Sequence, residues 1–162
     1  MWNWIKRDKK SSPKKNNDIQ KLVVKPIDYH PKIILAWAKA IEGNKELLVW
    51  LQANGFPELA MASRAIYLKN DAREWLSKNG YPHILAMING AEGNKMAQNW
   101  LLVHDFTTLY HMALAIEDEQ ESWDWLGKNV TPDMFILTKS IKKVKDQIEE
   151  SHNDVHSFGK DA

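Results

Sequence analysis

Hydrophobic and polar positions recur along this chain with a period of 25 residues. The period is clearest at Trp50, Trp75, Trp100 and Trp125, each of which is followed by a leucine. A strict period of about 20–50 residues is the sequence signature of a repeat array, in which each unit packs against its neighbours in the chain.

Each repeat unit predicts two short helices joined by tight turns. Asn-Gly at 54–55 and 79–80 follows the Trp-Leu pair, and both residue types tolerate the left-handed conformation that ends a helix. Pro57, Pro82 and Pro132 come three residues after an asparagine, where a proline suits the first turn of the next helix. About ten residues with helical spacing of apolar positions follow, and a second polar turn then ends each first helix.

Two further recurrences predict how the helices begin and pack. Asn44, Asn70 and Asn94 are placed to cap the second helix of their units. A small residue recurs at one position, and it lets two helix backbones approach closely: Ala40, Ala65, Gly90 and Ala115. We expect the repeated tryptophans to fill the core between stacked helix pairs, since each indole supplies a large apolar surface.

A longer amphipathic helix is predicted after the last Trp-Leu pair. Apolar residues with helical spacing lie between Met134 and Ile148, opposite a face of lysines and acids. We expect this helix to cover the open apolar end of the array. The prediction is therefore an all-α short α-solenoid of about four 25-residue helical hairpins with a longer C-terminal capping helix. Its repeats are 31–51, 52–76, 77–101 and 102–126, and its capping helix is 132–151.

The predicted repeat domain spans 22–151, between a leader at 1–21 and a flexible tail at 152–162. Residues 6–21 contain seven lysines and arginines and almost no apolar residues, which is typical of a disordered basic segment. The domain is similar in architecture to the broad α-solenoid class of tetratricopeptide, armadillo and HEAT proteins. Its period differs from theirs, and the ankyrin Thr-Pro-Leu-His motif is missing, so the resemblance transfers no functional residue.

Composition narrows the function classes. Lys+Arg is 22 and Asp+Glu is 21, so no strong net charge attracts nucleic acid. There is no cysteine, which excludes thiolate catalysis and disulfides and suits a reducing cytoplasm. No stretch reaches the roughly 18 apolar residues of a membrane span. We therefore expect a cytoplasmic protein.

Catalytic motifs are missing from the sequence. No phosphate-binding loop, nucleophile elbow or zinc-binding helix motif occurs, and the six histidines are not spaced as metal ligands. We expect no enzyme activity, no cofactor and no metal. We interpret the chain as a small intracellular interaction or scaffold module that binds an unknown protein or peptide. The candidate binding residues vary between units or are aromatic at surface positions: Lys39, Arg64, Tyr67, Arg73, Asn89, Gln98 and Trp123.

Two alternatives stay open at this point. Trp2 and Trp4 precede the basic cluster of the leader, a pattern that can attach a protein to an anionic membrane surface. The other alternative is an enzyme whose catalytic residues are far apart in the sequence and meet only in the folded structure. Separately, Glu42, Glu92 and Glu117 share one repeat position and form either a solvated edge or a surface for a basic partner. Trp123 stands where the two middle units have polar Arg73 and Gln98, and we expect the C-terminal helix to cover it.

Overall fold

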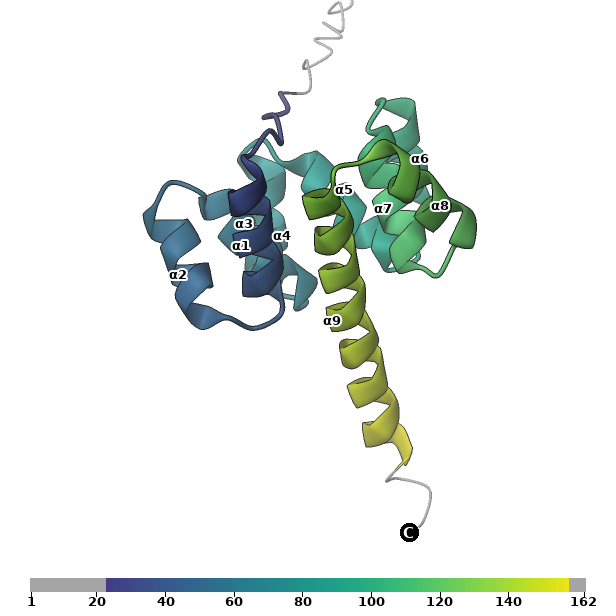
Figure 1. The fold of residues 1–162 in the computed structure, drawn as a ribbon. Helices are drawn as coiled ribbons and strands as arrows, with labels where there is room; N and C mark the ends of the chain where they lie inside the picture. The colour runs from purple at the N-terminus through teal and green to yellow at the C-terminus, as the bar shows by residue number, and fades with distance from the viewer. Residues whose placement is uncertain (1–22, 158–162) are drawn as a thin grey trace, which may run out of the picture.

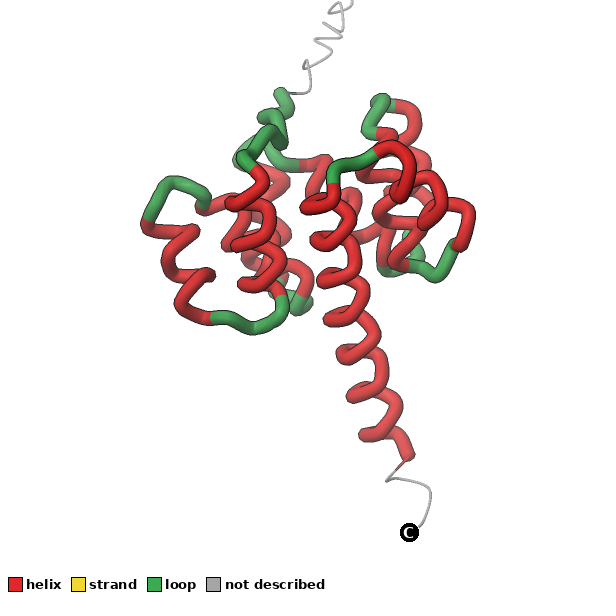
Figure 2. Tube along the Cα trace, viewed as in Figure 1, coloured by secondary structure: helices red, strands yellow, loops and turns green. Residues whose placement is uncertain are grey.

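The repeat pattern produces alternating short helices. The structure, a computed structural model, describes residues 23–157, and within that range it contains nine helices and no strand. Figure 2 shows how short the turns between them are. The helices are α1 (Pro31–Ile41), α2 (Lys45–Ala53), α3 (Pro57–Ile66), α4 (Asn70–Lys78), α5 (Pro82–Ala91), α6 (Lys95–Val103), α7 (Thr107–Ile116), α8 (Gln120–Asn129) and α9 (Pro132–Ser157). The predicted all-α repeat solenoid is confirmed.

The turns follow the chemistry expected of them. Pro57, Pro82 and Pro132 are the first residues of α3, α5 and α9. Gly80 has a φ of 93°, in the left-handed region that a side chain disfavours. Asp105 takes the same place in the next unit with a φ of 63°. An aspartate tolerates this conformation better than most residues, and this explains how the fourth unit keeps the turn without a glycine.

Two of the three expected helix caps are present. The Asn44 and Asn94 side chains accept hydrogen bonds from backbone N–H groups three residues ahead, each at 3.0 Å. The prediction for Asn70 was wrong, because Lys69 holds the cap position of α4 and Asn70 is the first helical residue. Position 69, and not 70, lies 25 residues from both 44 and 94, so strict use of the period would have avoided the error.

The asparagine that ends each second helix has a specific partner. The side-chain amides of Asn54, Asn79 and Asn129 each donate to the backbone carbonyl of the tryptophan four residues earlier, at 2.8 Å. His104 takes the same role at the end of α6, with a ring nitrogen 2.8 Å from the Trp100 carbonyl. Each tryptophan residue therefore provides the backbone acceptor that closes its own helix.

The expected role of the tryptophan rings needs correction. The leucine of each Trp-Leu pair is the fully buried member, whereas the indoles lie partly exposed at the rim of the core, and Trp50 is 42% exposed. Trp50, Trp75 and Trp100 stack on the aromatic residue that precedes the next first helix, whereas Trp125 stacks on His111. Trp75 lies 6.2 Å from Tyr81 at an interplanar angle of 10°, and Trp100 lies 5.7 Å from Phe106 at 12°. The first three indoles thus fasten the turn between units, and the leucines fill the core.

The first helices of the units form a closed ring. Helix α1 packs against α3, α3 against α5, α5 against α7, α7 against α9, and α9 returns to α1. Helices α2, α4 and α6 each pack against the first helices on both sides of them. In Figure 1, α9 lies between the α1–α3 side and the α7–α8 side and extends beyond the repeats. Gly90 permits the close α5–α7 packing, since a Cβ there would lie 3.1 Å from the Ala113 Cβ.

Helix α9 therefore does more than the predicted cap. Leu137, Ile141 and Val144 of α9 are buried in the common core, and α9 contacts the first unit as well as the last. It also continues to Ser157, six residues past the predicted end, so residues 152–157 are helical where a flexible tail was expected. The predicted disordered leader at 1–21 lies outside the described residues.

Candidate interaction surfaces

The inner side of the curled array is occupied by α9. Its basic residues pair with acidic turns from three units: Lys143 with Glu42 at 3.3 Å, Lys145 with Glu92 at 3.0 Å, and Lys142 with Asp118 at 2.7 Å. Glu42 also accepts a hydrogen bond from the Ser140 hydroxyl at 2.6 Å, and this bond and Lys143 together hold the pKa of its carboxyl below the ordinary value, against burial.

The shared glutamate position thus makes internal contacts in three units. Glu117 accepts hydrogen bonds from Lys95 and Gln98 in the preceding unit. In the second unit Tyr67 takes this position, and its hydroxyl donates to the Ile41 carbonyl at 2.8 Å. Each carboxylate of this row is therefore already paired within the array.

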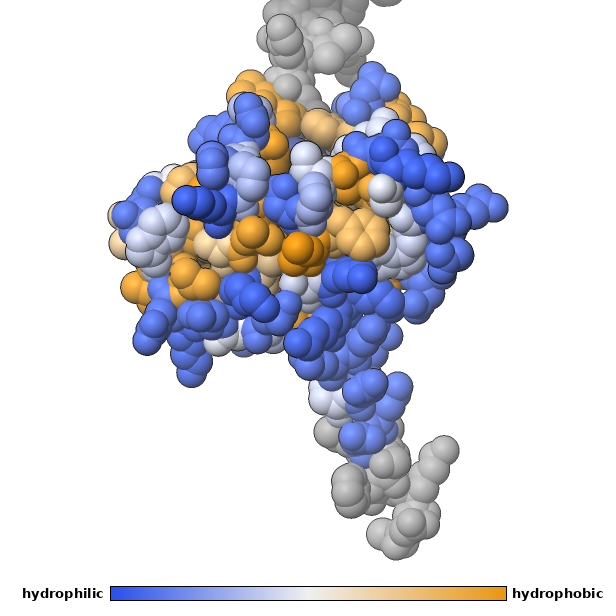
Figure 3. Space-filling model, viewed as in Figure 1, coloured by the Kyte–Doolittle hydropathy of each residue, from blue (hydrophilic) through white to orange (hydrophobic). Residues whose placement is uncertain are grey.

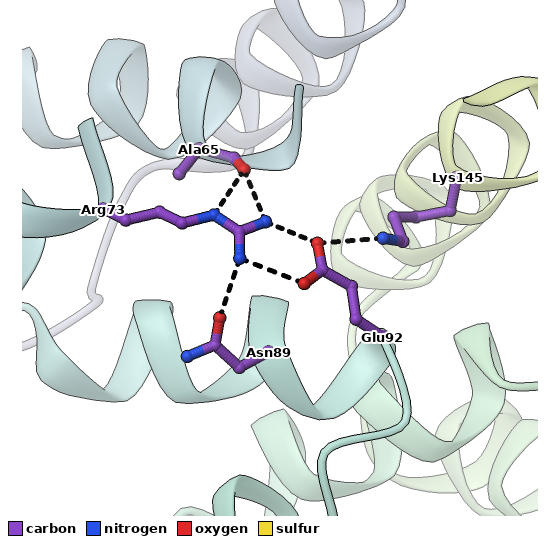
Figure 4. A network of polar contacts seen from close by, with 5 residues as sticks. All are labelled: Ala65, Arg73, Asn89, Glu92 and Lys145. Carbon is purple, nitrogen blue, oxygen red and sulfur yellow. Dashed lines mark hydrogen bonds and ion pairs between the residues drawn. The ribbon is translucent and has the colours of Figure 1, made fainter. Parts of the chain in front are cut away.

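Arg73 is the centre of a network of these contacts, which Figure 4 shows. Its guanidinium donates to the Ala65 carbonyl, to Asn89 at 3.2 Å and to both carboxylate oxygens of Glu92, which also pairs with Lys145. Burial alone would raise the pKa of Glu92, but the hydrogen bonds from Arg73 and Lys145 outweigh it and lower that pKa. This network joins α4, α5 and α9, so it ties two consecutive units to the closing helix.

Three of the predicted binding residues consequently have structural roles. Arg73 and Asn89 belong to this network, and Gln98 is 5% exposed and donates to the Gly90 carbonyl at 2.8 Å. Comparison of the repeats with one another predicted a surface position for all three, because they are polar and differ between units. Each of them has a partner in a neighbouring unit, and variability along the chain does not reveal such contacts.

The other predicted binding residues are at least partly accessible. Lys39 is exposed and pairs with Glu42 at 3.6 Å. Trp123 is partly buried and packs edge-on against Phe135 of α9, with ring centroids 5.4 Å apart, so the expected cover is present. Arg64 and Tyr67 lie together and line one groove.

This Tyr67 groove has a volume of about 280 Å³ between the first two units. Ala40, Leu48 and the Tyr67 ring supply apolar surface, and Lys45, Arg64 and Lys69 are the charged side chains that line it. Burial, and then the charge of Glu42, raise the pKa of the Tyr67 hydroxyl, which therefore stays neutral and donates to Ile41. An apolar floor surrounded by cations is suited to an apolar side chain flanked by carboxylates.

A second groove lies where the first helices begin, whereas the Tyr67 groove lies where α1 and α3 end. This His83 groove has a volume of about 480 Å³ and is bounded by the segment at 24–27, by the first turns of α7 and α9, and by His83 of α5. The segment is anchored: the Lys25 N–H donates to the Gly80 carbonyl at 2.9 Å, its ammonium lies 5.4 Å from the centre of the Tyr81 ring, and the Tyr29 hydroxyl donates to buried Glu58.

His83 is the unusual residue of this groove. It is 1% exposed, it stacks between Tyr81 and Phe106, and neither ring nitrogen has a hydrogen-bond partner within the described structure. Burial lowers its pKa to about 4. A weak interaction with the Lys25 backbone, whose geometry falls short of a normal hydrogen bond, offsets this in part, and the ring is neutral near pH 7. The sequence analysis did not select His83 as a candidate, because the histidines are scattered and not spaced as metal ligands. The usable signal was a polar residue directly after each helix start, at Glu58, His83, Thr108 and Asp133.

Apolar side chains also reach the surface elsewhere. Figure 3 shows apolar side chains interspersed with polar ones on the face that carries α1 and α9. Leu35 of α1 and Ile136 of α9 are among the exposed apolar residues. On α6, Met96, Leu102 and Val103 are exposed, whereas α4 has Asp71, Ser77 and Lys78 at the same repeat positions.

Neither metal ligation nor a membrane span emerges from the described residues. They contain no group of three or more potential ligands placed to hold a metal ion, and none of their helices has the length and apolar character needed to cross a bilayer. Comparison with known proteins found no matching family, no matching curated protein and no matching solved structure.

Proposed function

We propose that this protein is an interaction module that binds an acidic, apolar-containing peptide segment of a partner protein in the Tyr67 groove. The observation that supports the proposal is the arrangement of Arg64 and Tyr67. These two candidates come from one stretch of sequence, and the fold adds Leu48 and Lys45 from the preceding unit to complete a single groove.

The charges of the groove favour one class of partner. Among the residues that the structure describes, its lining contains three basic residues and no acidic one. The Arg64–Asp71 ion pair lies at its side, with both side chains well exposed, so it holds the guanidinium only weakly. Aromatic and arginine side chains are also enriched among the residues that dominate binding energy. A partner with an apolar side chain next to aspartate or glutamate therefore fits the groove.

The filled inner side supports the same choice. Extended solenoids usually bind partners along their concave surface. Here α9 packs against α1, α3 and α7 on that side and neutralises its acidic turns. A partner is thus directed to the grooves between units.

A random peptide library displayed on phage tests the proposal. Selection against the protein should enrich peptides that combine aspartate or glutamate with an apolar residue. Tyr67→Ala should weaken their binding by about tenfold or more, as expected for an aromatic anchor. Lys69→Glu should also weaken it, because Lys69 lines the groove and forms no ion pair with another described residue.

Lys128→Glu is the matched control, since Lys128 is an exposed lysine of α8 outside the groove. Its variant should bind the selected peptides as well as the unchanged protein does. Equal losses in Lys69→Glu and Lys128→Glu, or peptides without acidic residues, would contradict the proposal.

A further inference from the structure

We propose that the His83 groove is a second binding site, which holds the C-terminal carboxylate of a peptide that ends in an aliphatic residue. This site shares with the proposed function the idea that the ligand is a polypeptide. It uses a different groove at the opposite end of the repeats, so the two proposals fail independently.

His83 provides the first argument. A buried polar atom without a hydrogen bond costs free energy, and native proteins leave few of them. His83 has two such atoms, and it lines a groove of about 480 Å³ that is open to solvent. A neutral imidazole carries one N–H donor. A ligand with an acceptor in the groove would satisfy this donor.

Helix ends decide the charge of that acceptor. The first turn of α7 borders the groove at Thr107–Leu109, and its cap residue, Phe106, makes no side-chain cap hydrogen bond. The backbone N–H groups of this turn have no partner inside the helix, and the positive end of the helix dipole favours an anion beside them. Helix α9 also begins beside the groove. Lys25 and Asp105 offset one another in the lining, so the helix ends determine which charge is preferred.

The other residues that line the groove favour a particular side chain next to the carboxylate. Val24, Ile27, Leu109, Val130 and Met134 provide an apolar surface beside the helix ends. An aliphatic side chain next to a carboxylate matches this combination. Asp105 and the Asn129 side-chain oxygen add acceptors at the groove for the amide N–H groups of a peptide.

Two other occupants fit less well. A long acyl chain requires an enclosed channel, whereas this groove is open. The basic segment at 6–21 carries seven cations, which the positive helix ends disfavour. Both remain distinguishable outcomes of the experiment.

The test titrates the full chain with acetyl-alanyl-alanyl-leucine and follows backbone amide and imidazole nitrogen resonances by NMR. The free acid should bind with a Kd of about 1 mM or tighter. It should shift the Thr108 and Leu109 amides and the His83 ring nitrogens. The C-terminal amide of the same peptide should bind about tenfold more weakly or worse, because it lacks the charge.

His83→Phe should weaken the free acid by about tenfold or more while the protein stays folded, since a phenyl ring can still stack on Tyr81 and Phe106. His104→Phe is the matched control, because His104 also stacks on an aromatic ring but does not line the groove. Lys69→Glu, in the Tyr67 groove, should leave this binding unchanged.

Several results would overturn the proposal. Equal binding of the free acid and the amide would show that the groove does not recognise a carboxylate. Tighter binding of octanoate, or of a synthetic peptide of residues 6–21, would show that the groove prefers that occupant to a peptide carboxylate. His83 nitrogen shifts that stay unchanged up to saturating peptide would show that only water reaches the ring.

Discussion

Replacing Ile141 by alanine should strongly destabilise the whole array, whereas the same change at Ile136 should cost much less. Both isoleucines lie on α9, five residues apart. Ile141 is fully buried in the common core, and Ile136 is 44% exposed. The two substitutions change helix propensity equally, so their difference isolates the packing of α9 against the ring of first helices.

The magnitudes follow from burial. Truncating a fully buried isoleucine costs about 2–5 kcal/mol, because the transfer free energy is lost and a cavity is left. Ile136 loses roughly half of the 1.5–3 kcal/mol of a buried side chain and leaves no cavity, which gives about 1 kcal/mol. A gap of about 2 kcal/mol is a large share of the total stability of a domain, roughly 5–15 kcal/mol.

Urea unfolding followed by circular dichroism and tryptophan fluorescence measures both variants. The eight tryptophans are spread over the chain, and Trp37 in α1 and Trp125 in α8 place probes in the first and last units. In a closed ring, Ile141→Ala should lower the midpoint while the transition stays single, with an unchanged urea slope. Losses below about 1 kcal/mol in both variants, or separate melting of the last unit, would refute the packing of α9.

Three further predictions concern single groups. The folded pKa of His83 is lowered to about 4, so the unfolded chain binds the proton first as pH falls. Chemical unfolding across pH should therefore show the unchanged protein losing at most about 3 kcal/mol of stability between about pH 6.5 and 4, and His83→Phe should abolish this loss. Glu92→Gln should instead flatten the stability profile below about pH 4.5, because a carboxyl whose pKa is lowered stabilises the fold above that pH and loses this contribution on protonation; an acid limb as steep as that of the unchanged protein would argue against the network with Arg73. Asn79→Ala should cost about 1 kcal/mol in urea unfolding by deleting the hydrogen bond to the Trp75 carbonyl, and no measurable loss would mean that the bond does not form in solution.

The local structure was largely predictable from the sequence. Period, prolines and Asn-Gly turns report backbone conformation directly, so helices near 57, 82 and 132 could be located from residue type alone. The burial of Trp75 was not predictable in the same way. Trp and Leu are adjacent, and the sequence does not tell which of two neighbouring apolar residues points to the core of a short helix.

Closure of the array was also beyond sequence reasoning. It depends on a small rotation between successive units, and such a rotation leaves no mark on any one repeat. The closure explains why Arg73 and Gln98 are engaged internally while Arg64 and Tyr67 border a groove. Residue type identified polar candidates, but only the fold shows which of them meet another unit. The same reasoning applies to His83, whose groove is formed by parts of the chain far apart in sequence.

The contact between the first and last helices of the ring provides the most direct test of this account. Lys39 of α1 and Lys143 of α9 both pair with Glu42, and the chain has no native cysteine, so cysteines at these two positions can carry spin labels cleanly. Pulsed electron paramagnetic resonance should give one short distance, roughly 10–20 Å, as for neighbouring helices. An open stack would separate the first and fifth such helices by four steps of about 10 Å, and a distance near 40 Å would contradict the closed ring.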